Sequence, residues 1–242
     1  MPRWIYLLWA PGDQHRDGFC ERLLDELPKL ARNLGAHRLT LQCRDSDARV
    51  RSPSTGCTGR APFDALLSLT LDDPRKQSQL ELALEARADR VHGYAVDEML
   101  YTDYGGNRHA RARDWPDGER SPGVVSVTLL ERPRHVLYAD WIAHWHGRQS
   151  PLSELMQPRT RYVRSVVTRC LTPGAPIYGG IVEEAWPSAR HVEDPYLFYC
   201  AHSLEGLAEN MGAMLRSVTS FLELPRIQTV MTSEYFLLSD DS

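Results

Sequence analysis

The stretch that decides the fold is DWIAHWHGRQSPL, residues 140–152. Residues three or four positions apart lie on the same face of a helix, so Trp141, Trp145 and Gln149 would form one row. Two large aromatic side chains in such a row are typical of a helix that packs against the rest of a protein. The spacing therefore predicts a helix over residues 137–155 with its aromatic row turned inward.

The segments around this helix predict a βαββαβ unit. A β-rich apolar run precedes the helix and two more follow it, and then come a helical pattern with Ser203 as its N-cap and a last β-rich run. The expected strands are VVSVTLL (124–130), RYVRSVVT (161–168), IYGGIVEEAW (177–186) and TVMTSEYFLL (229–238), and the second helix is 203–222.

The first half of the chain repeats this order. Its expected strands are 4–10, 37–43, 63–71 and 91–101, and its expected helices are 17–34 and 74–89. Pro28 lies inside the first of these helices and predicts a kink or a break there, because proline cannot donate the helical hydrogen bond. Residues 44–62 are rich in Arg, Ser, Gly and Pro and are expected to form a loop.

Two tandem units therefore account for the chain. The first repeat spans residues 1–104, a polar, arginine-rich linker spans 105–122, and the second repeat spans 123–242. The charges of the linker are expected to be solvated. Each unit would form a four-stranded antiparallel sheet with both helices on one face, so two units can bury their open faces sheet on sheet. The fold class is α+β.

Composition limits the possible functions. The 242 residues are 42% hydrophobic and 25% charged, and the net charge is -4. This balance excludes a typical nucleic-acid binder and gives no polybasic patch for a membrane surface. The apolar run 4–10 is too short for a signal peptide or a membrane span, so we expect a cytoplasmic protein.

The chemical motifs of several enzyme classes are missing from the sequence. Five widely spaced cysteines without a C-x-x-C pair predict buried free thiols rather than a zinc site or disulfides. No P-loop, G-x-G-x-x-G, G-x-S-x-G or H-E-x-x-H motif occurs. His144 and His146 are two positions apart and cannot share a metal on one helix. We therefore expect no metal and no cofactor.

Three stretches resemble a known family. DWIAHWHGRQSPL (140–152), RYVRSVV (161–167) and YGGIVEEAW (178–186) are similar to an EthD-type member of the dimeric α+β barrel superfamily. The resemblance implies that two ferredoxin-like units form one barrel, here within one chain. It implies function only broadly, because the superfamily includes polyketide cyclases, muconolactone isomerases, cofactor-free monooxygenases and tandem haem proteins.

The resemblance also identifies a departure from the family pattern. When the two tryptophans and Pro151-Leu152 are matched to the pattern, Gln149 stands where the family usually has histidine. An amide does not titrate near neutral pH. Either His144 has taken over an acid–base role, or the site of this half does not work by acid–base chemistry.

The resulting hypothesis is a cleft between this helix and the sheet. Its lining would be Trp141, Trp145, His144, Arg148 and Gln149. The indoles would hold a flat apolar substrate, His144 would move a proton, and the amide and guanidinium would bind a carbonyl or enolate oxygen. The ordinary alternative is core packing for the tryptophans and the histidine and a surface salt bridge for Arg148, with His146 exposed.

Further candidates lie on the neighbouring elements. Tyr162 could donate a hydrogen bond to a substrate carbonyl. Glu183 and Glu184 alternate faces on their strand, so only one can point into the cleft, and Glu183 is the one that resembles the family carboxylate. His202 precedes the last helix, where capping or exposure is the alternative. In the first half His15, Tyr94 and Glu98 fall near an equivalent place, but that half is expected to be mainly structural.

The sequence thus favours a cofactor-independent enzyme that performs proton-transfer chemistry on a small aromatic or cyclic oxygenated compound. Isomerisation, cyclisation or lyase-type cleavage in catabolism or natural-product chemistry are the expected reactions, and the particle would be a monomer or homodimer. One alternative is a haem protein with His202 or His144 as axial ligand. The other is a non-catalytic protein that binds small molecules, which Gln149 favours.

Overall fold

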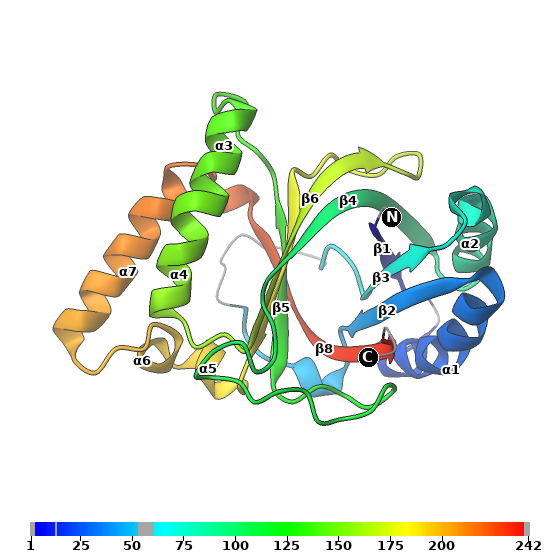
Figure 1. Ribbon diagram of the computed structural model, residues 1–242, viewed down its shortest axis with the longest axis horizontal. Coiled ribbons are helices and arrows are strands. Elements are labelled where there is room, and N and C mark those ends of the chain that lie inside the picture. Colours follow the sequence, from blue (N-terminus) through cyan, green and yellow to red (C-terminus); the bar gives the residue numbers. More distant parts are fainter. Residues whose placement is uncertain (1–2, 13, 53–60, 240–242) are drawn as a thin grey trace.

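The protein forms one closed antiparallel barrel of eight strands (Figure 1). The computed structural model describes residues 3–12, 14–52 and 61–239. The strands are β1 (Arg3–Trp9), β2 (Ala36–Cys43), β3 (Ala65–Leu71), β4 (Arg90–Thr102), β5 (Val124–Leu130), β6 (Arg161–Cys170), β7 (Gly180–Trp186) and β8 (Gln228–Leu238). Their order around the barrel is β1-β3-β2-β8-β5-β7-β6-β4, and β4 pairs with β1 to close it.

The two predicted repeats are joined along two seams. Each repeat contributes four neighbouring strands, and the repeats meet where β2 pairs with β8 and where β4 pairs with β6. The fold class, two ferredoxin-like units forming an α+β barrel within one chain, is confirmed. The sheets do not stack face to face as two separate layers. They join edge to edge, because this arrangement pairs the backbone groups of the outer strands as well as burying their inner faces.

The helices cover the outside of the barrel in two groups (Figure 1). One group covers the first repeat and the other covers the second. The helices are α1 (Arg16–Leu34) and α2 (Gln77–Glu85) in the first repeat, and α3 (Tyr138–His144), α4 (Ser150–Met156), α5 (Arg190–Glu193), α6 (Pro195–Phe198) and α7 (Leu204–Thr219) in the second. Short 3₁₀ turns occur at Ser46–Ala48, Pro74–Lys76 and Leu224–Arg226. Among these described helices, none has the length and apolar character needed to cross a membrane.

Alternation along the strands explains the apolar run at the start of the chain. In β1, Trp4 and Tyr6 point outward into the core beneath the helices of the first repeat. Ile5 and Leu7 point inward and belong to the core inside the barrel. Because both faces of β1 are covered, all seven of its residues are buried.

Helix α1 differs from the prediction at Pro28. It runs without interruption through the proline from Arg16 to Leu34. Leu23, Leu27 and Ala31 around the proline are buried against the sheet. This packing outweighs the hydrogen bond that proline cannot make, since most helix stability in proteins comes from the buried face.

The linker between the repeats packs on the barrel more closely than expected. The N–H of Ser121 donates to the carbonyl of Glu234 in β8 (2.8 Å). The guanidinium of Arg113 lies 4.3 Å from the centre of the Phe236 ring. The linker charges are therefore only partly solvated, because several of them bind β8 and its surroundings.

Cysteine side chains are free throughout the described part of the chain. Cys20 and Cys43 are buried, and Cys170 and Cys200 are half-buried. Cys57 lies outside the described residues. The prediction of free thiols holds for these four cysteines, two of which are only partly enclosed.

Candidate active site

The helix of the opening stretch contains a π turn. Helix α3 continues into a π-helical segment, Trp145–Gln149, and then into α4. Pro151 lacks an N–H and its ring would collide with the carbonyl four residues earlier in a regular α-helix. The wider turn accommodates the proline, and the Ser150 hydroxyl donates to the Trp145 carbonyl (2.9 Å). Such π turns frequently occur at functional sites.

Gly179 and Gly180, at the start of β7, make room for the two indoles. Trp141 and Trp145 are both almost fully buried, and their ring centres are 4.9 Å apart. A Cβ added to Gly179 would lie 3.1 Å from the Trp141 ring, and one added to Gly180 would lie 2.5 Å from the Trp145 ring. The Gly-Gly pair therefore sets how closely the helix approaches the sheet.

Replacing Gly180 with alanine is expected to destabilise the protein by about 1–3 kcal/mol, the usual cost of overpacking a core. The added methyl group must displace the Trp145 ring. Gly147→Ala is the matched control, because a Cβ there meets no atom within 4 Å and alanine favours a helix. Urea unfolding of both variants measures the difference, and equal stabilities would show that the indole has room to move.

A cavity of about 500 Å³ lies between this helix, α7 and the outer face of the sheet in the second repeat. Its walls are mainly apolar and aromatic, as is usual for small-molecule sites. The lining residues are Ser126, Thr128, Leu130, Trp145, Gln149, Gln157, Tyr162, Val182, Glu184, Val192, Glu193, Pro195, Phe198, Tyr199, Met211, Met214, Leu215, Val218, Phe221, Leu222, Leu224, Ile227 and Thr229.

Glu184 is the carboxylate that β7 contributes to this cavity. Its Oε1 accepts a hydrogen bond from Nη1 of Arg159 at 2.7 Å, and its Oε2 lies 3.4 Å from the Ser126 hydroxyl. Arg159 is fully buried and also donates to the Ser153 hydroxyl (2.9 Å). Oε1 is thus held in place by a buried cation. Among the described residues, the only hydrogen bond of Oε2 is the long one from Ser126.

Tyr162 lies beside this pair with its hydroxyl already engaged. The Tyr162 hydroxyl is 3.1 Å from Ser150 Oγ. Ser150 donates its own proton to the Trp145 carbonyl and accepts from Arg164 (2.9 Å), so the tyrosine is left to donate to the serine. Burial raises the pKa of Tyr162, which keeps the phenol protonated. Tyr162 therefore presents acceptor lone pairs to the cavity, whereas the sequence suggested a donor.

The residues expected to share one cleft are divided between three places. Trp145 and Gln149 line the cavity, and Trp141 lies behind them in the core. His144 and Arg148 line a separate depression of about 230 Å³. The π turn and the inward rotation of the tryptophans place these two residues on another side of the helix.

His144 connects the helix to the end of α7. Its Nε2 is 3.1 Å from Ser217 Oγ and 2.9 Å from Ser220 Oγ, and its ring stacks on Phe221. Burial, and then the charge of Arg148, lower the pKa of His144. A neutral histidine bonded to two serines of α7 and its C-terminal turn is well suited to joining these elements.

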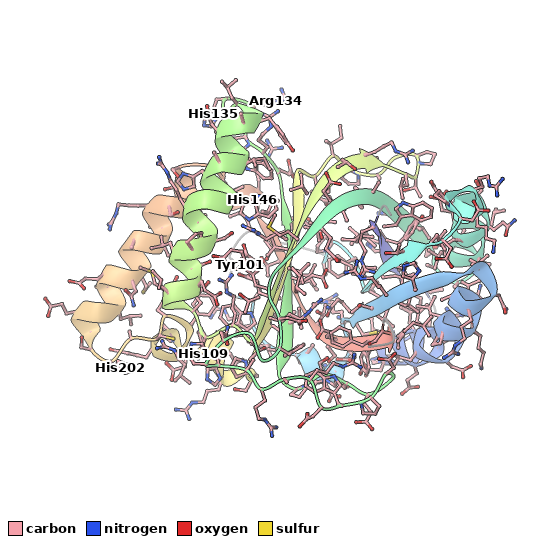
Figure 2. All side chains as sticks on the ribbon, in the orientation of Figure 1. Tyr101, His109, Arg134, His135, His146 and His202 are labelled. Carbon is pink, nitrogen blue, oxygen red and sulfur yellow. The ribbon has the colours of Figure 1, made fainter. Side chains whose placement is uncertain are left out.

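His146 and His202 are the two other histidines of the second repeat that the sequence singled out. His146 was expected to be exposed, but it lies half-buried between helix and sheet, with its ring against Trp145 (Figure 2). His202 lies exposed before the start of α7, at the outer end of that helix (Figure 2). Neither histidine lines the 500 Å³ cavity.

Glu183 lies on the opposite face of β7, inside the barrel. Its Oε2 accepts from Nε2 of Gln42 at 2.9 Å, and the same amide reaches Glu234 at 3.2 Å. Arg161 forms an ion pair with Glu234 (2.9 Å) in this interior cluster. Glu183 is 3% exposed and cannot reach the cavity, so the candidate carboxylate of this strand is Glu184.

The position of Glu183 predicts a pH dependence of stability. Burial raises the pKa of Glu183 above its ordinary value of 4.5. A raised folded-state pKa means that the stabilising contribution is complete below pH 4.5 and is lost as the pH rises through the folded value. Glu183→Gln should remove this loss, so its free energy of unfolding relative to wild type should increase with pH above 4.5. Urea titrations across pH test this, with exposed Glu119→Gln as control, and parallel curves would contradict it.

No protein-family model and no curated protein sequence matches the chain. Several solved structures are similar to the chain. An anthrone oxidase-like protein superposes with a TM-score of 0.58 at 10% identity, covering 96% of this chain and 90% of that one. A variant of the chlorite dismutase from Candidatus Nitrospira defluvii (TM-score 0.48, 7% identity, 96% and 90% covered) and a dye-decolorizing peroxidase from Bacteroides thetaiotaomicron (0.47, 7%, 95% and 92%) are also similar. The first of these shows that another protein shares the α+β barrel fold of this chain.

The cavity does not fit a histidine-ligated haem. The two histidines considered as axial ligands, His144 and His202, both lie outside it, and its described lining contains neither histidine nor cysteine. The Tyr162 hydroxyl, another possible ligand, is bonded to Ser150. The side chains that face the cavity are instead suited to an organic molecule.

Proposed function

We propose that the protein is a cofactor-independent enzyme that transfers protons on a small cyclic or aromatic oxygenated compound. The observation that carries the proposal is Glu184, held by Arg159 at the wall of an otherwise largely apolar cavity. A carboxylate in such surroundings can act as a general base if substrate atoms come within hydrogen-bond reach. The similarity of residues 140–152 to the EthD pattern is consistent with this class of reaction.

The proposed reaction begins at a carbon acid next to a carbonyl group. Glu184 Oε2 takes the proton and leaves an enolate on the substrate. The amide N–H groups of Gln149 donate hydrogen bonds to the enolate oxygen and stabilise it. They are available for this because the amide otherwise donates only to the thioether of Met214 (3.0 Å), a weak acceptor. Return of the same proton from Glu184 to a different carbon gives isomerisation. Attack of the enolate carbon on a second carbonyl of the substrate gives cyclisation, and the alkoxide formed there takes the proton back from Glu184.

Packing around the substrate follows from the walls of the cavity. Trp145 supplies the face of an indole, and Met211 and Met214 of α7 supply flexible apolar side chains. Arg159 would hold the carboxylate in one orientation throughout the reaction. It forms a second ion pair with Glu154 (3.2 Å), so its charge is balanced even when Glu184 is protonated.

Solvent deuterium exchange tests the proposal without knowledge of the natural substrate. The protein is incubated in D₂O with a panel of cyclic ketones, tetralones and anthrones, and incorporation at the carbon next to the carbonyl is followed by NMR. Met211→Trp, which fills the cavity from α7, should abolish the exchange. Leu204→Trp on the same helix is the control, because Leu204 is 74% exposed and outside the cavity lining.

The same experiment distinguishes catalysis from binding without catalysis. Binding without catalysis is the alternative function that Gln149 favours. Binding of panel members that Met211→Trp abolishes, without exchange in the wild-type protein, would identify a non-catalytic binding protein. Exchange that persists unchanged in Met211→Trp would place the chemistry outside this cavity.

A further inference from the structure

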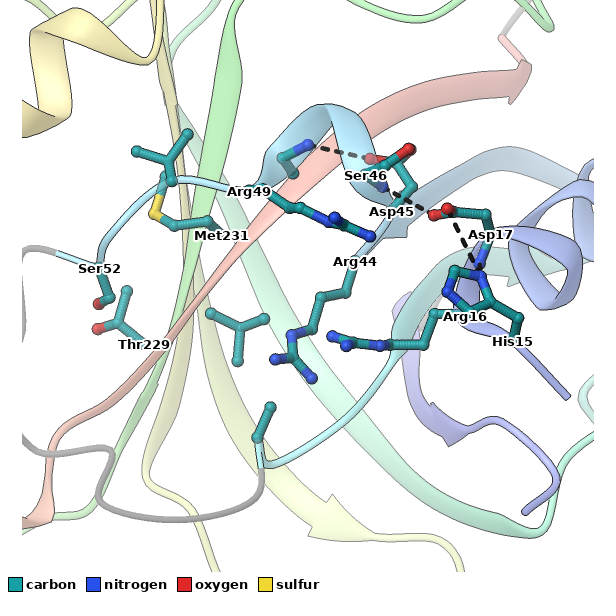
Figure 3. A pocket seen from close by; sticks show the side chains of 14 residues that line it. His15, Arg16, Asp17, Arg44, Asp45, Ser46, Arg49, Ser52, Thr229 and Met231 are labelled. Atoms are coloured by element: carbon teal, nitrogen blue, oxygen red, sulfur yellow. Dashed lines mark hydrogen bonds and ion pairs between the residues drawn. The ribbon is translucent and has the colours of Figure 1, made fainter. Parts of the chain in front are cut away.

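A second cavity lies beside the start of β8, where Thr229 lines both it and the α3–α7 site. It has a volume of about 370 Å³ and is formed by the start of α1, the segment after β2 and the first residues of β8 (Figure 3). Three arginines line it: Arg16, Arg44 and Arg49. In Figure 3 the ends of the Arg16 and Arg44 side chains lie near each other, and the end of Arg49 lies on the side of Asp45.

The carboxylates of this cavity are used by other groups. Asp17 accepts from the backbone N–H of Ser46 at 2.8 Å. Asp45 accepts from Ser233 Oγ at 2.7 Å and from the Tyr235 hydroxyl at 3.2 Å. These two side chains fix the loop to α1 and β8, and they do not pair with the arginines at salt-bridge distance.

Two of the arginines have donors left over. Arg44 approaches Asp64 at 3.6 Å. For Arg16 and Arg49, by contrast, no ion pair or hydrogen bond of the side chain is found within the described part of the chain. Arg16 and Arg49 thus bring two positive charges to one cavity without a paired carboxylate, and an anion with several oxygens can accept paired hydrogen bonds from such guanidinium groups.

The remaining walls and the size of the cavity define the kind of anion. Val50, Ala61, Val230 and Met231 add apolar lining to the same cavity. A water molecule takes up about 30 Å³ in the liquid, so the cavity is much larger than an inorganic ion requires. A ligand that fits both kinds of lining has an oxyanion head and an apolar body.

We infer that this cavity binds a small organic oxyanion, such as a phosphate monoester or carboxylate with an aromatic or short aliphatic body. The arginines hold the head and the apolar lining holds the body. The site belongs to the first repeat and to β8, and it is independent of the proton-transfer chemistry proposed for the second repeat. A net charge of -4 disfavours general anion attraction, so binding would depend on these arginines.

Calorimetry with phenyl phosphate, benzoate, inorganic phosphate and phenol tests the inference on the full chain. Phenyl phosphate should bind at least tenfold more tightly than inorganic phosphate, and added salt should weaken its binding. Benzoate should bind through the same arginines. No binding of phenyl phosphate or benzoate at millimolar concentration, or equal affinity for phenyl and inorganic phosphate, would overturn the inference.

Charge-neutral variants locate the binding. Arg16→Gln and Arg49→Gln should each weaken phenyl phosphate binding by about tenfold, which corresponds to 1.4 kcal/mol. Arg51→Gln in the same loop and Arg32→Gln on α1 are controls, since both lie outside the lining. Phenol, which lacks the charge, should bind all variants alike. An equal loss in the controls would show that the anion responds only to overall charge and would overturn the site.

Discussion

Replacing Glu184 with glutamine is expected to lower the rate of deuterium exchange by about 10²- to 10⁴-fold, the usual contribution of a positioned general base. Glutamine has nearly the same shape, and its amide oxygen can still accept the hydrogen bond from Arg159 that Glu184 accepts at 2.7 Å. The cavity should therefore keep its form, and binding of the panel compounds should change little. The rate constant and the affinity, measured separately, show whether the chemical step alone is affected.

Two control variants make this result specific. Glu193→Gln removes a more exposed carboxylate of the same cavity. His144→Ala removes the titratable group that the sequence favoured, which lies in the neighbouring depression. Both should retain exchange within about threefold of wild type. A large loss in His144→Ala with little change in Glu184→Gln would transfer the role of base to the histidine.

Replacing Arg159 with methionine is expected to destabilise the protein by about 3 kcal/mol, the lower end of the range for removing one partner of a buried ion pair. Arg159 is fully buried, and its removal leaves both Glu184 and Glu154 without their cation. The guanidinium also lies 3.9 Å from the centre of the Tyr162 ring, and that cation–π contact is lost too.

Urea unfolding at neutral pH measures this effect. Arg148→Met is the matched control, because Arg148 is exposed and such surface changes usually alter stability by less than about 0.5 kcal/mol. A difference below 1 kcal/mol at neutral pH would show that water compensates the two carboxylates.

The sequence predicted the helices and strands of this fold better than the strand pairing that closes the barrel. Runs of β-rich apolar residues predicted all eight strands, and helical spacing predicted the main helices. The two seams could not be read from local patterns, because Gln42 and Glu234 of neighbouring strands are 192 positions apart. The short helices α5 and α6, only four residues each, are too brief for a periodic signal.

The site was predicted in part for similar reasons. Strand alternation correctly required only one of two adjacent glutamates to reach the cavity side. Gly180 indicates which of the two glutamates this is. Gly180 faces the helix, where it makes room for the Trp145 indole. Residues two and four positions later face the same way, and the second of them is Glu184. Arg159 was missed because it lies in a short non-periodic segment between α4 and β6.

The closing of the barrel by its last strand affects how the protein is made. Strand β8, at the end of the chain, pairs with β2 of the first repeat and β5 of the second. During synthesis the first repeat emerges while β2 still lacks this partner, and exposed strand edges promote association between chains. Closure of the barrel is therefore expected to wait for the synthesis of β8, and until then nascent chains would depend on chaperones to protect the open edge of β2.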